Sequence, residues 1–227
     1  NLDALKSILQ DNPSIKIASI FTHLAGADDP IYEDFTHQQY LLLKEATDSI
    51  ESILGYHPIC HILNSAGIIS YPDYKCDMVR LGIGIYGVDA SGKHQSQLQV
   101  VGTLRTVISQ IKTYNKEETI GYSRKGVLHE TSRIATIAMG YADGLDRRCG
   151  NGNCQVLVNG VLCPTIGNVC MDMAMIDVTN AQVQEGDEVI IFGQNPHIST
   201  IAHQIGTIPY EIITGISDRV KRVFVKE

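Results

Sequence analysis

The sequence predicts an α/β segment, made of the last strands and helices of a TIM-type (β/α)8 barrel, followed by a C-terminal mainly-β domain. Up to about residue 92, apolar stretches with helical spacing alternate with short strand-like apolar runs. The runs end in polar or charged groups, and in a parallel barrel the reactive residues lie at the C-terminal ends of the strands. After residue 92 the apolar period becomes two, which is typical of β-strands. We therefore expect an incomplete barrel in residues 1–92 and a β-domain in residues 93–227.

Two helices are expected in the first half. Apolar residues recur at helical spacing between residues 2 and 9, and the pattern stops at Asn12-Pro13. A second helical pattern begins at Asp28-Asp29-Pro30 and extends to residue 54. Aspartates cap helix N-termini and proline suits the first turn, so this start signal is strong.

Three apolar runs are expected as barrel strands: residues 15–21, 59–63 and 78–81. The first is followed by His23 and the second by Asn64-Ser65, while the third carries Arg80 before Gly82. A closed barrel needs about eight strands, and three alone would leave two unpaired sheet edges. We therefore expect the N-terminal part of the barrel domain to be missing from this chain, which begins with Asn1.

The second half shows hairpin and strand signals. Residues 155–162 predict a hairpin that turns at Asn159-Gly160, the strongest short-range hairpin signal. Apolar and other residues alternate over 171–176, and a strand is expected at 189–192 after the turn at 185–187. One helix is expected near residues 201–205.

Composition narrows the classes of function. The 227 residues carry 18 Lys and Arg against 25 Asp and Glu, a net charge of −7 without a dense basic block, which argues against a nucleic-acid partner. No apolar run of membrane-spanning length is present, which argues against a membrane protein. None of the six cysteines forms a C-x-x-C pair, so we expect no metal site and reduced thiols in a cytoplasmic protein.

Residues 82–87 form a literal G-x-G-x-x-G, the dinucleotide-binding pattern. That pattern also needs a following helix and an acidic residue about 20 positions later, and neither is expected here. We instead expect the backbone amides of Gly82 and Ile83 to face an anion. Ser65, in the segment Asn64-Ser65-Ala66-Gly67, fits the same role, although alone that segment also fits an ordinary helix cap.

Tyr141 lies between glycines in Gly140-Tyr141-Ala142-Asp143-Gly144, directly after an apolar run. It fits either a turn with a surface aromatic or a general base, a role in which a phenol needs nearby positive charge. The Met171-Asp172 segment fits a core strand with a turn, and an isolated His23 fits a buried structural histidine.

Taken together, the motifs of the chain resemble those of the alanine racemase family. They occur in the family's order and cover nearly the whole chain: Phe21-Thr22-His23, Asn64-Ser65-Ala66-Gly67, Asp77-Met78-Val79-Arg80-Leu81-Gly82-Ile83, Gly140-Tyr141-Ala142-Asp143-Gly144, Ile166-Gly167-Asn168-Val169-Cys170-Met171-Asp172-Met173 and Pro209-Tyr210-Glu211. Each motif alone is weak, but six in order are specific.

The resemblance implies a pyridoxal-phosphate (PLP) enzyme of fold type III. It implies that Arg80 contacts the pyridine nitrogen of the cofactor and that His23 lies close to its ring. The phosphate cradle is implied to consist of Ser65, Gly82, Ile83 and Tyr210.

The resemblance also implies a reaction and an assembly. The family interconverts L- and D-alanine, which supplies D-alanine for cell-wall peptidoglycan, and works as a head-to-tail homodimer whose active sites are shared between subunits. Tyr141 matches the catalytic tyrosine that exchanges the α-proton on the L-alanine side at the partner subunit's cofactor. Met171 matches a position whose backbone helps to hold the substrate carboxylate, with Asp172 beside it.

The family's second base is the lysine that forms the Schiff base with PLP, on the first barrel strand. No segment of this chain matches that motif, and the family's substrate-binding arginine on an earlier strand is absent as well. We therefore expect that the chain alone neither binds PLP covalently nor racemises alanine. A parent protein fused to a Mur ligase is compatible with the sequence.

Two other functions remain open from the sequence. One is a serine or broad-specificity racemase of the same fold. The other is a non-catalytic interaction module in which the β-domain docks a partner, so that Tyr141 has no role in catalysis.

Overall fold

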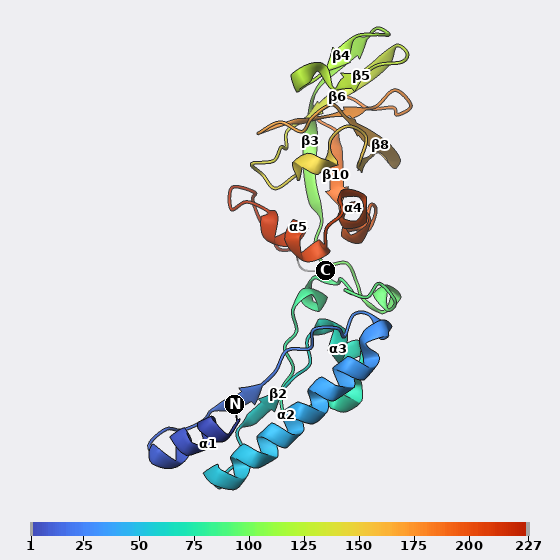
Figure 1. Ribbon diagram of the computed structural model, residues 1–227. Helices are drawn as coiled ribbons and strands as arrows, with labels where there is room; N and C mark the ends of the chain where they lie inside the picture. Colours follow the sequence, from blue (N-terminus) through green and yellow to red (C-terminus); the bar gives the residue numbers. More distant parts are fainter. Residues whose placement is uncertain (1, 226–227) are drawn as a thin grey trace. The chain divides into compact units, whose positions relative to one another are not determined.

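The computed structural model describes residues 2–225, which fall into two compact units that divide between Gln99 and Val100 (Figure 1). The first, unit 1, is an α/β segment, and the second, unit 2, is mainly β. No helix within residues 2–225 is long and apolar enough to cross a membrane.

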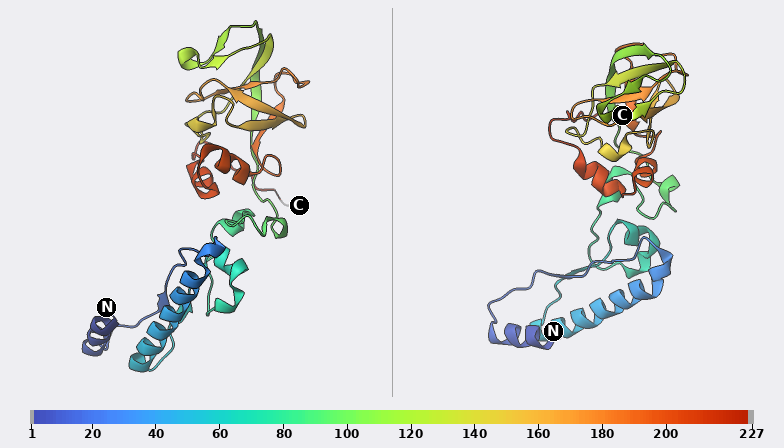
Figure 2. Two further views of the ribbon diagram at one scale, coloured as in Figure 1. Left: turned by 45° about the vertical axis from the view of Figure 1, so that its right-hand side comes forward. Right: turned by 45° about the horizontal axis from the view of Figure 1, so that its top comes forward.

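Unit 1 contains three α-helices and two strands. Its elements are α1 (Leu2–Asp11), β1 (Ser19–Phe21), α2 (Glu33–Leu54), β2 (Ile59–His61) and α3 (Ser65–Ser70), with short 3-10 turns at Pro30–Tyr32, Pro72–Tyr74, Ile83–Tyr86 and Gln95–Gln97. The strands pair in parallel, with Ile20 opposite Cys60. The long helix α2 lies along them (Figure 2), and Leu43 of this helix packs in one buried cluster with Cys60 and Ile62.

The expected helix start is confirmed in detail. The Asp29 side chain accepts a hydrogen bond from the Ile31 amide and caps the 3-10 turn that leads into α2. Gly55, with a φ of 70°, ends the helix in the left-handed region, where glycine is favoured.

The expected third strand, residues 78–81, is not a strand in the structure. Only one parallel bridge forms there, between His61 and Met78. The Arg80 amide still donates to the Leu63 carbonyl, so the segment runs beside β2 without a regular ladder. The parallel sheet of residues 2–225 therefore has two strands. The strand expected over residues 15–21 begins only at Ser19.

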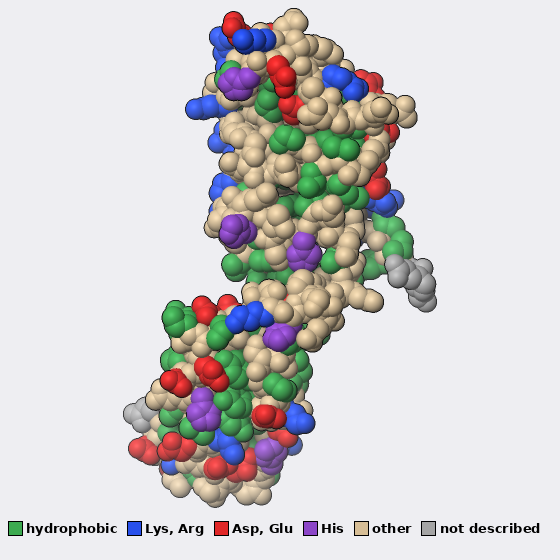
Figure 3. All heavy atoms as spheres, turned by 90° about the vertical axis from the view of Figure 1, so that its right-hand side faces the viewer, with side chains coloured by type: hydrophobic (Ala, Val, Ile, Leu, Met, Phe, Trp, Pro, Cys, Tyr) green, Lys and Arg blue, Asp and Glu red, His purple; other side chains and the backbone are tan. Residues whose placement is uncertain are grey.

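The sheet of unit 1 has one covered face and one open face. Ile20 and Cys60 pack into the core, whereas Phe21 and Ile59 are 61% and 49% exposed. Figure 3 shows apolar side chains intermingled with carboxylates on one face of unit 1.

A histidine ties three segments of unit 1 together. His57 Nδ1 lies 2.5 Å from Glu51 Oε1 at the end of α2, and His57 Nε2 lies 2.8 Å from Asp77 Oδ2. The same Asp77 oxygen accepts the Cys60 amide of β2. Hydrogen bonds to Asp77 and then to Glu51 raise the pKa of His57 above its ordinary value, because both carboxylates favour the imidazolium.

The contacts of His57 with Glu51 and Asp77 predict that the stability of unit 1 depends on pH. A pKa raised on folding means that protonated His57 contributes its full stability below pH 6.5, and that the contribution is lost as the pH rises through the folded pKa. The urea midpoint of the unaltered chain, followed by the amide signals of α2, should therefore exceed that of H57Q at low pH, and the difference should shrink as the pH rises past 6.5. A difference that stays constant with pH would contradict this role of His57.

Unit 2 is built on a closed six-stranded antiparallel barrel in the order β10-β3-β6-β9-β8-β7. Its strands are β3 (Leu104–Tyr114), β6 (Ser132–Ile137), β7 (Gln155–Val158), β8 (Val161–Ile166), β9 (Ala174–Asp177) and β10 (Glu188–Phe192). Closure leaves no unpaired sheet edge in this barrel, and Ile137, Val158 and Ile176 are fully buried inside it. The predicted fold class, a partial α/β region followed by a mainly-β domain, is confirmed.

Smaller elements lie at the two ends of the barrel. A two-stranded hairpin of β4 (Thr119–Ile120) and β5 (Gly126–Val127) extends from one end, and helices α4 (Ile198–Ile205) and α5 (Pro209–Gly215) lie at the other (Figure 1). Two 3-10 turns, Tyr122–Arg124 and Arg147–Cys149, complete the unit. Where the sequence predicts one helix, the structure thus has two, because Gly206 at a φ of 68° ends α4 and Pro209 starts α5.

The hairpin at Asn159-Gly160 is confirmed. Asn159 and Gly160 have φ values of 47° and 82°, the signature of a turn that matches strand twist. Asn159 Nδ2 also donates to the Gln182 carbonyl at 3.1 Å and to Asp187 Oδ2 at 2.8 Å. The turn therefore joins β7 to β8 and also holds the loop before β10.

The positive φ of Gly160 predicts that Gly160→Ala lowers the stability of the protein. A Cβ at this position meets no atom within 4 Å, so only the positive φ resists the substitution. The free energy of unfolding should fall by about 1 kcal/mol. Gly102→Ala is the matched control, because Gly102 has equally open space without a positive φ. Chemical denaturation that gives the two variants equal stability would contradict this account.

Candidate active site

Arg80 forms the centre of a polar cluster in unit 1. One guanidinium nitrogen donates to the Thr22 carbonyl at 2.8 Å and lies 3.2 Å from His23 Nδ1. Another lies 2.5 Å from His61 Nδ1. These partners stand at the ends of β1 and β2, so the ends of the two parallel strands converge on one cation.

The histidines beside Arg80 act as neutral acceptors. A guanidinium only donates, so His61 Nδ1 must carry its lone pair toward Arg80. Burial and then the positive charge of Arg80 lower the pKa of His61 below its ordinary value. The Phe21 ring lies 5.1 Å from the guanidinium carbon and stacks on the His61 ring with centroids 5.0 Å apart.

The charge of Arg80 is not neutralised by an acid within residues 2–225. Its hydrogen-bond acceptors there are backbone carbonyls and imidazole nitrogens, and no ion pair with a carboxylate is present. Unit 1 thus holds a fixed positive charge at the strand ends, where it acts on whatever group lies beside it.

Ser65 organises the turn that follows Arg80. Its Oγ accepts the amides of Gly82 at 2.9 Å and Gly84 at 3.2 Å. A Cβ on Gly84 would lie 3.5 Å from Ser65 Oγ, so the Ser65 side chain packs directly against the turn. The Gly82 amide therefore donates to Ser65 Oγ, so two of the residues expected at the phosphate lie side by side at this turn. The hydroxyl, having accepted twice, keeps its own hydrogen to donate.

The neighbouring residues support this turn from within the fold. Asn64 Oδ1 accepts the Gly67 amide and caps α3, and Asn64 Nδ2 donates to the Leu24 carbonyl at 3.1 Å. Ile83 is 3% exposed, so its side chain belongs to the core.

In unit 2, the Tyr141 loop lies against the segment that carries Met171. The amides of Tyr141 and Ala142 donate to the carbonyls of Cys170 and Met171, both at 2.9 Å. A Cβ on Gly140 would lie 2.4 Å from the Cys170 and Met171 oxygens, so only glycine allows this approach. Residues 171–173, expected in an alternating strand, lie outside β9, which begins at Ala174.

The side chains of Tyr141 and Met171 on these two segments are exposed to solvent. Tyr141 is 44% exposed and Met171 is 55% exposed. The Asp172 carboxylate accepts a hydrogen bond from Arg219 at 2.6 Å, and the same guanidinium reaches Asp143 Oδ1 at 2.7 Å. Tyr141, Met171 and Asp172 are thus brought together within unit 2.

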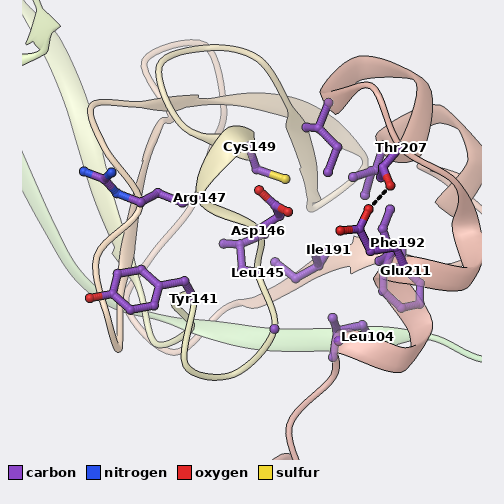
Figure 4. Close-up of a pocket in the computed structure, with 15 residues that line it drawn as sticks. Leu104, Tyr141, Leu145, Asp146, Arg147, Cys149, Ile191, Phe192, Thr207 and Glu211 are labelled. Atoms are coloured by element: carbon purple, nitrogen blue, oxygen red, sulfur yellow. Dashed lines mark hydrogen bonds between the residues drawn. The ribbon is translucent and has the colours of Figure 1, made fainter.

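A cavity of about 440 Å³ lies beside this loop in unit 2 (Figure 4). Leu145, Ile191 and Phe192 give it apolar walls, and Tyr141 lines one side of it. The Tyr141 ring turns its hydroxyl away from Glu211 on the opposite side (Figure 4). The hydroxyl is therefore directed away from the cavity.

Tyr210 lies on α5, and that helix is anchored to the turn after the Tyr141 loop. Arg148 pairs with Asp146 at 2.7 Å and with Glu211 at 3.5 Å, while Glu211 also accepts the Thr207 hydroxyl. Tyr210 itself is 40% exposed.

Sequence reasoning missed His61 and Arg219. His61 lies two residues after the predicted strand begins, and its position before Asn64-Ser65 was the available signal. Arg219 is separated from Asp143 by 76 positions, and no local pattern pairs residues so far apart. Within residues 2–225, no three His, Cys, Asp or Glu side chains group as metal ligands, and all six cysteines are free thiols.

Comparisons with known proteins give these features a context. The family model described as the alanine racemase N-terminal domain matches residues 1–90, and that of the alanine racemase C-terminal domain matches residues 101–224. The alanine racemase of Clostridium kluyveri is 36% identical over 94% of this chain, and alanine racemase 1 of Oceanobacillus iheyensis is 38% identical over 93% of it. The chain spans 56% and 58% of the lengths of these two relatives.

Solved structures agree. The Clostridium difficile alanine racemase complex with cycloserine superposes on 97% of this chain at 32% identity and a TM-score of 0.85, using 60% of that protein. The Bartonella henselae alanine racemase with covalently bound pyridoxal phosphate matches 99% of the chain at 28% identity and a TM-score of 0.83, using 61% of that protein. The chain belongs to the alanine racemase family.

Proposed function

We propose that this chain supplies part of the active site of a PLP-dependent alanine racemase, which interconverts L- and D-alanine and so provides D-alanine for peptidoglycan. The observation that carries the proposal is the Arg80 cluster. A guanidinium held by carbonyl oxygens and neutral imidazoles presents a positive charge to a ligand. That charge suits an unprotonated ring nitrogen.

The residues of unit 1 fit the cofactor. Bound PLP supplies an electron sink that acidifies the α-proton of an amino acid. Ser65 has a hydroxyl hydrogen left to donate to a phosphate oxygen, and Gly82 carries no Cβ that would keep an anion from its backbone. We assign the cofactor phosphate to these residues and to Tyr210, and the space beside the cofactor ring to His23.

Arg80 limits how strongly the cofactor can act. A fixed cation beside the ring nitrogen disfavours a second positive charge on that nitrogen. The neutral ring is a weaker acceptor of electrons, which suits a reaction that needs only brief loss of one proton. Because its partners are neutral, Arg80 keeps its full charge for this task.

Tyr141 is proposed as the acid and base on the L-alanine side of the α-carbon, acting at the partner subunit's cofactor in a homodimer. Its hydroxyl is turned outward from unit 2, as a group that serves a ligand held elsewhere requires. The Met171 backbone, which contacts the Tyr141 loop, is proposed to help hold the substrate carboxylate, with Asp172 beside it. The opposite face needs a second base.

Removal of the Tyr141 hydroxyl tests this role in a protein that contains this chain and racemises alanine. Tyr141→Phe should lower the rate by about 10²- to 10⁴-fold, the usual worth of a positioned acid or base. The loss should be greatest for proton abstraction from L-alanine, measured by solvent deuterium incorporation. Tyr56→Phe is the control, because the Tyr56 hydroxyl contacts the backbone of Ile17 in unit 1. An unchanged Tyr141→Phe rate would favour the interaction-module alternative.

The second base is proposed to be a lysine outside the 227 residues. No lysine of residues 2–225 hydrogen-bonds to Arg80 or to the Ser65 turn.

Incubation of the 227-residue chain with PLP and then borohydride should therefore leave no stoichiometric pyridoxyl-lysine at a single site, as judged by peptide mass mapping. The full-length Clostridium kluyveri relative serves as the positive control. Stoichiometric labelling of one lysine in this chain would overturn the proposed division of the active site.

A further inference from the structure

Three chain segments of unit 2 meet at the Tyr141 loop. Residues 140–142 lie on the backbone of residues 170–171 through two amide–carbonyl bonds. On the other side, a Cβ on Gly144 would lie 2.6 Å from the Gly215 carbonyl oxygen, and the Ser217 amide donates to the Asp143 carbonyl at 3.1 Å. The loop is therefore enclosed between the Met171-Asp172 segment and the start of the C-terminal tail, residues 216–225, which follows α5.

Arg219 joins the two outer segments through side chains. Its Nε donates to Asp143 Oδ1 at 2.7 Å, and a terminal nitrogen donates to Asp172 Oδ1 at 2.6 Å. The other Asp143 oxygen accepts the Gly140 amide at 2.8 Å, so the carboxylate of Asp143 is used at both ends. One guanidinium thus connects the loop of Tyr141 to the residue beside Met171.

The position of Asp143 makes this contact stronger than an ordinary surface ion pair. Exposed pairs contribute little because water competes for both charges. The Asp143 side chain is only 17% exposed, whereas Arg219 is 47% exposed. Burial opposes ionisation of Asp143, but the hydrogen bonds from Arg219 and Gly140 outweigh it and hold the pKa of this carboxyl below its ordinary value.

The other arginine of the tail shows by contrast what is particular to Arg219. Arg222 donates to the carbonyls of Ile216, Ser217 and Val220 in its own segment. Its nearest acid is Asp218, four residues before it, at 3.8 Å. It therefore stabilises the tail locally without reaching either loop.

We propose that Arg219 is a positioning residue that fixes the Tyr141 loop relative to Asp172, so that the phenol and the substrate-carboxylate contacts address one substrate in register. This role rests on the function proposed above. Without Arg219, the Gly140 amide still holds Asp143, and the backbone bonds to residues 170–171 remain. The loss should therefore loosen the two segments without unfolding the unit.

The loosening is measurable in the 227-residue chain by amide hydrogen exchange, independently of any activity. In Arg219→Met, exchange at Tyr141 and Ala142 should quicken about tenfold while the β7–β8 amides remain unchanged. Arg222→Met should leave all of these amides as in the unaltered chain. Exchange at Tyr141 that is no faster than in Arg222→Met, or that is equally faster in β7–β8, would overturn the proposal.

Kinetics in a racemase-competent protein containing this chain test the consequence. Misplacement of a reacting group by about 1 Å costs up to about 10²-fold, so Arg219→Met should lower kcat by roughly 10- to 100-fold with a smaller change in KM. Arg219→Lys keeps the charge but lacks the planar guanidinium that reaches both carboxylates, and should recover part of the rate. Arg222→Met should retain full activity.

The outcomes separate the two proposals. Suppose that the unaltered protein does not racemise alanine, but that Arg219→Met still speeds exchange of the Tyr141 amide. The proposed function then fails, while the positioning of the Tyr141 loop by Arg219 is supported. If the protein racemises alanine and Arg219→Met matches Arg222→Met in kcat, the positioning role is wrong. If Arg219→Met does not fold, Arg219→Lys decides by the same two measurements.

Discussion

The positive charge of Arg80 is the constraint on which the account of unit 1 depends. Buried and half-buried cations are usually paired with an acid. Here the guanidinium is satisfied by carbonyl oxygens at the ends of two strands and by imidazole nitrogens that must stay neutral to accept. These acceptors bind the guanidinium without cancelling its charge. Burial and then this charge lower the pKa of His61.

Unit 2 meets a different requirement: under the proposed function, it holds the exposed phenol of Tyr141 in a defined place. It does so with backbone contacts that only glycine permits at position 140, and with the acid–arginine contacts among Asp143, Asp172 and Arg219. The closed barrel beneath provides a rigid support. A loop positioned by a rigid scaffold is the usual construction of a reactive site.

Local signals in the sequence predicted local structure well. Asp29-Pro30 marks a helix start and Asn159-Gly160 marks a hairpin, because each acts through its own backbone preferences. The segment 78–81 is apolar but forms no regular strand, since a strand needs a partner in register and only the His61–Met78 bridge is present. The glycines and aspartates around Tyr141 were visible in the sequence, but the arginine that joins them is set by the fold.

The protonation state of the cofactor ring tests the central claim most directly. The ¹⁵N chemical shift of the pyridine nitrogen would be measured by NMR with ring-labelled PLP bound to the full-length protein that contains this chain. The charge of Arg80 predicts the shift of a neutral pyridine nitrogen across the pH range in which the protein is folded. A pyridinium shift at neutral pH would contradict the role assigned to Arg80 and, with it, the proposed chemistry of the site.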